Sequence, residues 1–277
     1  MKRRKMIWNR LLGTLLILAF GFCAFEYFIL NNKVLWKEKG SIAVKDLPSD
    51  LRSRFAKLQE LYGGDERFDD MVQNYSKYPE DLLELAAHNK DTFIYVYRYP
   101  VRKKIVLEEP LHESLKELPI LYQWDERWGY ATYGDGLMGL TGCGPAVLSM
   151  VLSYLTKDPV ITPLQIARYS KKHGLYMGSG NSGDFFHSYS NAVSVHCIDL
   201  LPTENQLRES MMKGPPITVS MDPGDFTTAG HLIVLVGIDR AGKLILHDPD
   251  SLTRTKKSRD LCRAASQMAA AWGFTKE

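Results

Sequence analysis

The chain has 277 residues, of which 45% are hydrophobic and 24% are charged, and its formal net charge is +3. These proportions are typical of a globular protein and exclude a disordered chain or a fibrous repeat. Residues 1–10 contain five basic residues and no acidic one, so the rest of the chain carries a formal charge of −2. This distribution leaves no basic surface for nucleic acid, and we expect no nucleic-acid partner.

An apolar run over residues 11–30 contains a single charged residue, Glu26. About twenty apolar residues in a helix span the roughly 30 Å hydrocarbon core of a bilayer. No small-residue cleavage site is present, and basic residues are concentrated before the run, so the pattern predicts an uncleaved signal anchor. We expect residues 1–32 to cross the lipid of the cell membrane once, with the rest of the chain outside the cytoplasm. A cleaved export signal predicts the same compartment.

Residues 33–117 predict a small helical stalk or cap. Apolar side chains recur at spacings of three and four over residues 40–60, which is typical of an amphipathic helix that ends at Gly63-Gly64. Its apolar positions are Leu47, Leu51, Phe55, Leu58 and Leu61. A second helix is expected over 78–89, with Pro79 in its first turn.

The chain changes character at Leu118, and residues 118–277 predict one α+β domain. The stretch Gly129–Gly142 holds five glycines, which predicts a loop. Apolar periodicity and turn residues predict helices first and an antiparallel sheet second. Helices are expected over 144–155, 162–174, 184–193 and 203–214. Strands are expected over 194–201, 215–221, 231–238 and 243–248.

Several short motifs resemble cofactor or metal sites, but none has the required context. The sequence GSGNSG at 178–183 matches a dinucleotide-binding loop, yet the preceding strand is too short, so we interpret it as a loop. The acidic stretches around Asp222 and Asp250 lack the spaced ligands of a calcium loop. No cysteine lies in a C-x-x-C pair, which argues against structural zinc. We therefore expect neither a cofactor nor a metal.

Cys143 is the candidate nucleophile. It precedes an apolar helix, and Pro145 suits the first turn of that helix, so Cys143 is expected at the helix N-terminus. The unpaired amides and positive dipole there stabilise a thiolate. Gly142 and Gly144 leave room for a substrate carbonyl beside the sulfur. The alternative is a buried cysteine that only fills space.

His231 and Asp248 are predicted to form a base and its orienting acid. If residues 231–238 and 243–248 pair as a hairpin with a loop at Arg240-Ala241, His231 faces Asp250, and Asp248 lies two residues away on the same face. Diagonal neighbours in a sheet lie roughly 7–8 Å apart, within reach of an imidazole–carboxylate hydrogen bond. Taken singly, His231 is more often a core histidine and Asp248 more often a turn residue before Pro249. Together with Cys143, these alternatives weaken.

A cysteine nucleophile needs a base, and the base needs a group that fixes its tautomer. The tetrahedral intermediate also needs hydrogen-bond donors. The backbone amide of Cys143 and the side-chain amide of Gln123 are the candidates for that oxyanion site. The aromatic residues Trp124, Trp128 and Tyr130 are interpreted as packing residues.

Three stretches together, residues 118–129, 141–155 and 230–251, resemble the bacteriocin-leader-processing (double-glycine) cysteine peptidases, and especially their stand-alone membrane-anchored relatives. The resemblance implies a papain-like fold for residues 118–277. It also implies that Gln123, Cys143, His231 and Asp248 are the catalytic residues. The family cleaves after a double glycine in the leaders of exported peptides. The chain differs from those enzymes because it has no transporter domain and a longer interval between Gln123 and Cys143.

The sequence thus predicts a membrane-anchored extracytoplasmic cysteine peptidase that acts on a peptide or protein substrate. Two alternatives stay open at this point. The same residues suit an amidase or transpeptidase acting on peptidoglycan peptides, and the same fold suits an inactive module that binds the cell wall.

Overall fold

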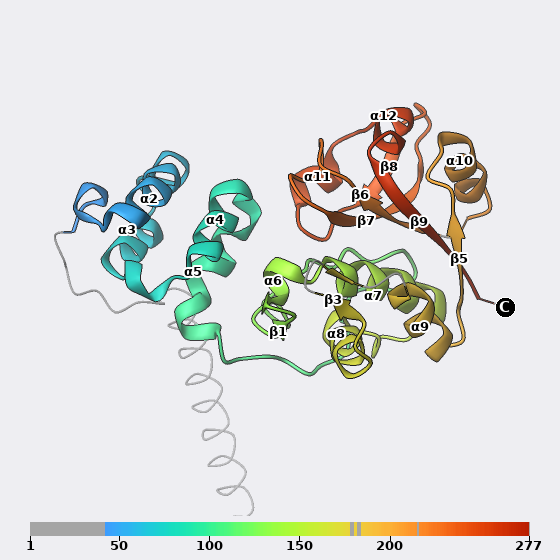
Figure 1. The fold of residues 1–277 in the computed structure, drawn as a ribbon, viewed down its shortest axis with the longest axis horizontal. Coiled ribbons are helices and arrows are strands. Elements are labelled where there is room, and N and C mark those ends of the chain that lie inside the picture. The colour runs from blue at the N-terminus through green and yellow to red at the C-terminus, as the bar shows by residue number, and fades with distance from the viewer. Residues whose placement is uncertain (1–41, 178–179, 182–183, 215, 277) are drawn as a thin grey trace, which may run out of the picture. The chain divides into compact units, whose positions relative to one another are not determined.

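The computed structural model describes residues 42–177, 180–181, 184–214 and 216–276 (Figure 1). The chain divides into two compact units after Tyr78. The boundary lies inside the range 33–117 that the sequence analysis assigned to one helical segment. The predicted membrane helix at 11–30 lies outside the described residues. None of the helices that the structure does describe is long and apolar enough to cross a bilayer.

The first unit is helical. The amphipathic helix predicted over 40–60 is present as α2, Ser49–Tyr62, which ends at Gly63 as predicted but begins later, after Pro48. It buries Leu51, Phe55 and Leu58. Helix α3, Glu66–Gln73, was not predicted and begins at the capping residue Asp65, whose side chain accepts a hydrogen bond from the Arg67 amide. Two short 3-10 helices complete the unit, η1 at Val44–Asp46 and η2 at Tyr75–Lys77.

The second unit contains nine α-helices and a five-stranded sheet among its described residues. Its helices are α4 Glu80–His88, α5 Phe93–Arg102, α6 Met138–Thr141, α7 Cys143–Thr156, α8 Pro163–Lys172, α9 Phe185–Ala192, α10 Glu204–Met212, α11 Leu252–Lys256 and α12 Leu261–Ala265, with η3 at Lys90–Thr92 between α4 and α5. The large sheet consists of β5 His196–Leu200, β6 Ile217–Met221, β7 His231–Ile238, β8 Leu244–His247 and β9 Met268–Thr275. Two small hairpins are β1 Thr132–Tyr133 with β2 Gly136–Leu137, and β3 Tyr176–Met177 with β4 Gly180–Asn181.

The large sheet is antiparallel throughout, with the strand order β5-β9-β6-β7-β8 (Figure 1). The predicted α+β class is therefore confirmed. The C-terminal strand β9 was not predicted, yet it lies between β5 and β6. Its Ala-rich sequence at 268–271 has no alternating pattern, because both faces of the strand are partly covered.

Two hydrophobic cores form on opposite faces of the sheet. One combines α7, α8 and α9 with side chains such as Val234 of β7 and Phe274 of β9. The other combines α10 and α12 with Ile233, Leu235 and Leu246. Because successive residues of a strand point to opposite faces, β7 contributes to both cores and reads as a continuous apolar run.

The hairpin of β7 and β8 has nearly the register that the sequence predicted. Val234 pairs with His247 and Leu235 with Leu246, as a two-residue loop would require. The loop is in fact one residue longer, since the Asp239 amide donates to the Lys243 carbonyl, and a bulge at Val236 compensates for the extra residue. The bulge therefore restores the predicted alignment at the end of the hairpin that carries His231.

The predicted loop at 129–142 contains more structure than expected, because β1, β2 and α6 all lie within it.

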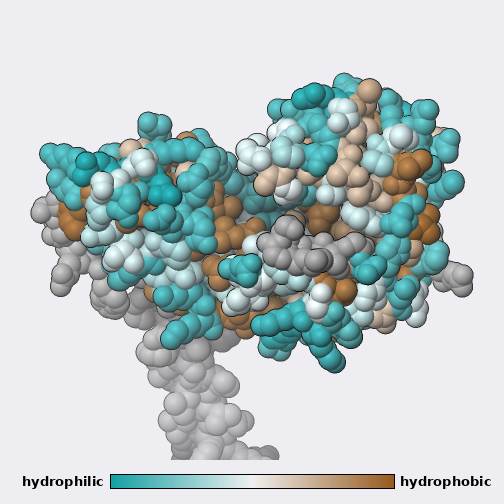
Figure 2. Space-filling view, viewed as in Figure 1, coloured by the Kyte–Doolittle hydropathy of each residue, from teal (hydrophilic) through white to brown (hydrophobic). Residues whose placement is uncertain are grey.

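The visible surface of the second unit is mainly hydrophilic, with hydrophobic areas over β5 and α10 (Figure 2). Ile198, Leu201 and Met212 are exposed in that part of the chain. The outer edge of the sheet is thus partly apolar.

Candidate active site

Cys143 is the first residue of α7, as predicted, and its side chain is partly accessible. Gly142 precedes it as the N-cap, and no side chain of the described residues caps this end of the helix. Pro145 lies in the first turn, where a missing amide hydrogen costs no helical hydrogen bond. The free amides and the dipole of α7 are therefore directed toward the sulfur and any anion that forms beside it.

The glycine before the nucleophile has a packing role. A Cβ on Gly142 would lie 2.5 Å from the carbonyl oxygen of Met138, which is the acceptor for the Gly142 amide. Any other residue would open the turn between α6 and α7. The position of Cys143 therefore depends on this close backbone contact as well as on the helix itself.

His231 and Asp248 are brought together as the hairpin register predicts. Nε2 of His231 lies 2.8 Å from Oδ1 of Asp248, and both side chains are buried, with exposed fractions of 9% and 0%. An ionised carboxylate only accepts hydrogen bonds, so the proton between them belongs to Nε2. Nδ1 is then the nitrogen left to interact with Cys143, whose side chain helps to raise the pKa of the imidazole.

The carboxylate of Asp248 has a full set of donors. Besides His231, the amides of Asp250 and Ser251 donate to Oδ1 over 2.9 and 3.2 Å. Arg254 donates from Nε to Oδ2 over 2.6 Å. Burial raises the pKa of Asp248, but the charges and hydrogen bonds of His231 and Arg254 outweigh burial and hold it well below its usual range.

The imidazole of His231 is stabilised in its protonated form. Burial lowers its pKa, but the charge and hydrogen bond of Asp248, followed by those of Cys143, outweigh burial and raise the pKa above its ordinary value. A cationic imidazole between a carboxylate and a thiol is the arrangement that a thiolate–imidazolium pair requires.

Gln123 lies beside the turn that leads into the nucleophile. Its side chain is 4% exposed, and Nε2 donates to the carbonyls of Gly139 and Leu140 over 3.0 and 3.3 Å. Within the described part of the chain its Oε1 is buried without a hydrogen-bond partner. Gln123 thus braces the α6 turn, and its role as an oxyanion donor stays a prediction.

Two further residues belong to the site: Arg254, which the sequence did not single out, and Trp124, which was interpreted as a packing residue but is half-buried and makes a polar contact there. Arg254 lies in the first turn of α11. Ser251 caps this helix, because its Oγ accepts a hydrogen bond from the Arg254 amide over 3.1 Å. Trp124 donates from its indole nitrogen to the carbonyl of Asp250 over 2.7 Å. The capping serine was a visible sequence signal for α11, but the pairing of Arg254 with Asp248 has no local signature.

The other cysteines of the described chain are poor nucleophiles. Cys197 is buried on β5, where burial and the charge of Asp199 raise its pKa to about 12. Cys262 is exposed, and its hydrogen bond with Glu204 and the charge of that residue raise its pKa. Trp128 and Tyr130 are buried, in agreement with their interpretation as packing residues.

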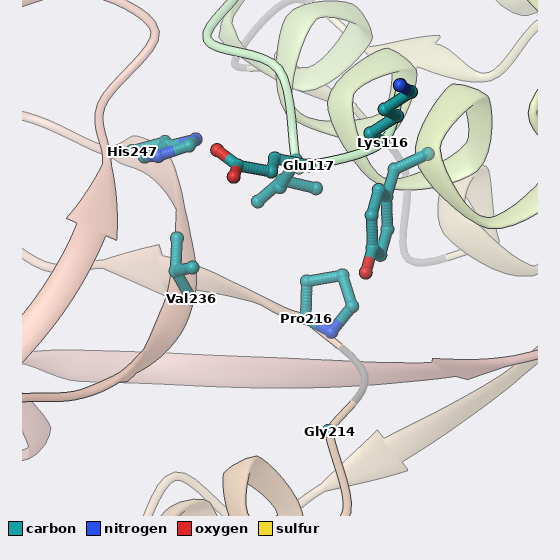
Figure 3. A pocket seen from close by; sticks show the side chains of 8 residues that line it. Lys116, Glu117, Gly214, Pro216, Val236 and His247 are labelled. Carbon is teal, nitrogen blue, oxygen red and sulfur yellow. The ribbon is translucent and has the colours of Figure 1, made fainter. Parts of the chain in front are cut away.

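A separate cavity of about 320 Å³ contains none of the predicted site residues. It lies beside Tyr154 in the last turn of α7, and Glu117 and His247 point toward each other across it (Figure 3). Among the described residues no group of three His, Cys, Asp or Glu side chains is arranged to hold a metal ion. The loop motif at 178–183 lies largely outside the described residues.

Comparison with known proteins identifies a matching family and matching solved structures. The Peptidase_C39 like family matches residues 115–277, more than half of the chain. The peptidase domain of Streptococcus ComA, a bi-functional ABC transporter involved in a quorum sensing pathway, aligns with a TM-score of 0.43 and 17% identity, covering 58% of this chain and all of that domain. No curated protein matches the sequence. Because the family match covers most of its second unit, this chain belongs to the Peptidase_C39 like family.

Proposed function

We propose that this protein is an active cysteine peptidase with Cys143 as nucleophile, His231 as base and Asp248 as the residue that orients the base. The observation that carries the proposal is the buried hydrogen bond between His231 and Asp248, beside a cysteine at the start of α7 whose side chain helps to raise the pKa of the imidazole. A structural cysteine needs neither a helix N-terminus nor an adjacent imidazole with a raised pKa. Membership of a peptidase family supports peptide-bond hydrolysis as the reaction.

In the proposed reaction, Sγ of Cys143 adds to the carbonyl carbon of the scissile peptide bond while His231 holds the thiol proton. The oxyanion accepts hydrogen bonds from the amide of Cys143 and from Gln123. Collapse of the intermediate breaks the C–N bond, and His231 gives its proton to the leaving amine, which leaves a thioester. His231 then takes a proton from water while the hydroxide adds to the thioester carbon. Collapse of this second intermediate breaks the C–S bond and releases the acid product and the Cys143 thiolate, to which His231 can return the proton.

The site is proposed to work outside the cytoplasm, tethered by the apolar run at 11–30. This part of the proposal rests on the sequence alone: one hydrophobic stretch preceded by five basic residues. A peptide or protein on the outer side of the membrane is then the substrate class.

Replacing Cys143 with Ala should abolish turnover and leave the fold intact, because the sulfur is the proposed attacking atom. Iodoacetamide at near-neutral pH should label Cys143 in the wild type faster than the other thiols, as measured by peptide mass spectrometry. Cys262→Ala is the matched control and should keep full activity, since that thiol is exposed but has a raised pKa. Faster labelling of Cys197 or Cys262 would show that the nucleophile is misassigned.

His231 and Asp248 should behave as one unit. We expect His231→Ala to remove nearly all activity and Asp248→Asn to remove less, because a poorly oriented imidazole still samples the productive tautomer. The measurement is kcat/KM for both single variants and the double variant, with Asp239→Asn in the turn of the same hairpin as control. Losses that simply multiply in the double variant would contradict the proposed coupling.

Gln123→Ala should lower kcat by about 10²–10³-fold if the amide is an oxyanion donor. Alkylation of Cys143 forms no oxyanion, so its rate should stay at the wild-type value. If Gln123 instead acts only by bracing the α6 turn, both rates should fall together, because the thiol itself is displaced. Measuring turnover and alkylation on the same preparation therefore separates the two roles.

Protease added to intact cells should digest residues 79–277 if the anchor has its N-terminus in the cytoplasm. The measurement is the size of the remaining fragment, detected through a tag at the N-terminus. A protein that resists the protease until the cells are lysed would contradict the proposed topology and place the peptidase in the cytoplasm.

A further inference from the structure

The segment 80–102, made of α4, η3 and α5, precedes the residues that match the family, which begin at 115. It nevertheless belongs to the same compact unit as the candidate active site. Its polar contacts reach both the loop that follows Asp248 and the turn that precedes Cys143.

The first contact is made at the junction of α4 and η3. Asn89, which is buried, donates from Nδ2 to the carbonyl of Asp250, the same oxygen that receives the indole hydrogen bond of Trp124. The Oδ1 of Asn89 accepts from the Asp91 amide over 3.1 Å, so the side chain is fixed from both ends.

Asp91 makes the second contact. Its Oδ2 accepts from the backbone amide of Thr253 over 3.2 Å and lies 3.4 Å from the hydroxyl of Ser251. These two groups are the start of α11, whose first turn carries Arg254. Asp91 thus holds the helix end from which Arg254 reaches the buried carboxylate of Asp248.

The third contact lies on the other side of the site. Tyr95 of α5 donates to the carbonyl of Gly129 over 2.8 Å, and the same carbonyl accepts from the amide of Gly139 in α6. A Cβ on Gly139 would lie 2.3 Å from the hydroxyl oxygen of Tyr95, so α5 and α6 are packed too closely here for any side chain at position 139. Gly139 is also an acceptor for Gln123.

We propose that segment 80–102 is a positioning element of the active site, in which Asn89 and Asp91 hold the loop of Asp248 and Tyr95 supports the turn before Cys143. The inference rests on the proposed function of that site and extends it to residues outside the family match. Asn89 and Asp91 act through Asp250, Ser251 and Thr253, so they are positioning residues that do not touch the substrate.

The test compares Asp91→Ala, Asp91→Asn and Lys90→Ala in the full chain. Asp91→Ala removes the acceptor of the Thr253 amide, whereas Asp91→Asn keeps an acceptor oxygen in the same place. Lys90 is exposed between the two positioning residues and serves as the matched control. Four quantities are measured: kcat, KM, the alkylation rate of Cys143, and the pKa of the His231 imidazole by NMR.

We expect Asp91→Ala to lower kcat by about 10- to 100-fold with little change in KM, because a small displacement of the orienting acid misplaces the base. The pKa of His231 should fall toward its ordinary value, since the carboxylate that raises it has moved. Asp91→Asn should retain most of the wild-type activity, and Lys90→Ala all of it. Asn89→Ser, with a shorter donor, provides a second variant if Asp91→Ala does not fold.

Three results would overturn the proposal. The first is wild-type kcat in Asp91→Ala and Asn89→Ser. The second is a loss of thermal stability with unchanged kcat per folded molecule, which would make the segment structural only. The third is an alkylation rate of Cys143 and a His231 pKa that the variants leave unchanged. A wild type without thiol-dependent turnover would refute the proposed function alone, and these two measurements would then still test the positioning role.

Discussion

A carboxylate without solvent contact must receive its hydrogen bonds and its opposite charge from the protein, and Asp248 is such a group. Removing one partner of a buried ion pair costs about 3–5 kcal/mol, a large share of the stability of one domain. The loop after β8 is therefore shaped around this side chain: two of its amides and the guanidinium of Arg254 all point at the two oxygens of Asp248.

The division of these partners between the two oxygens decides what His231 can do. Arg254 makes its shortest hydrogen bond to Oδ2, and His231 bonds to Oδ1. Arg254 therefore keeps the carboxylate ionised without occupying the position of the imidazole. An anion held in this way fixes the proton on Nε2 of His231 and leaves Nδ1 for the thiol of Cys143. The tautomer of the base thus follows from how a buried charge is satisfied.

Local sequence rules were sufficient for the parts of the site that depend on neighbours in the chain. Pro145 located the start of α7, and the spacing of His231 and Asp248 placed both on one face of a hairpin, since moving a loop of fixed length by one residue along the chain shifts the pairing by two. The actual loop is one residue longer, and the bulge at Val236 restores the alignment. The remainder depends on distant contacts. Strand β9 has no alternation because both of its faces are partly covered, and Arg254, Asn89 and Asp91 carry no pattern that points to Asp248.

The extent of the catalytic unit follows from the same constraint. The carbonyl of Asp250 receives two side-chain donors, Trp124 from within the residues that match the family and Asn89 from before them. A buried polar group that loses its partner costs about 1–3 kcal/mol, which is enough to shift a loop whose conformation is held by a few such bonds. Because Asp248 is carried by that loop, the geometry of the base depends on a residue outside the matched region. The region that supports the candidate site therefore extends at least to Asn89, at the junction of α4 and η3, and not only to the residue where sequence similarity ends.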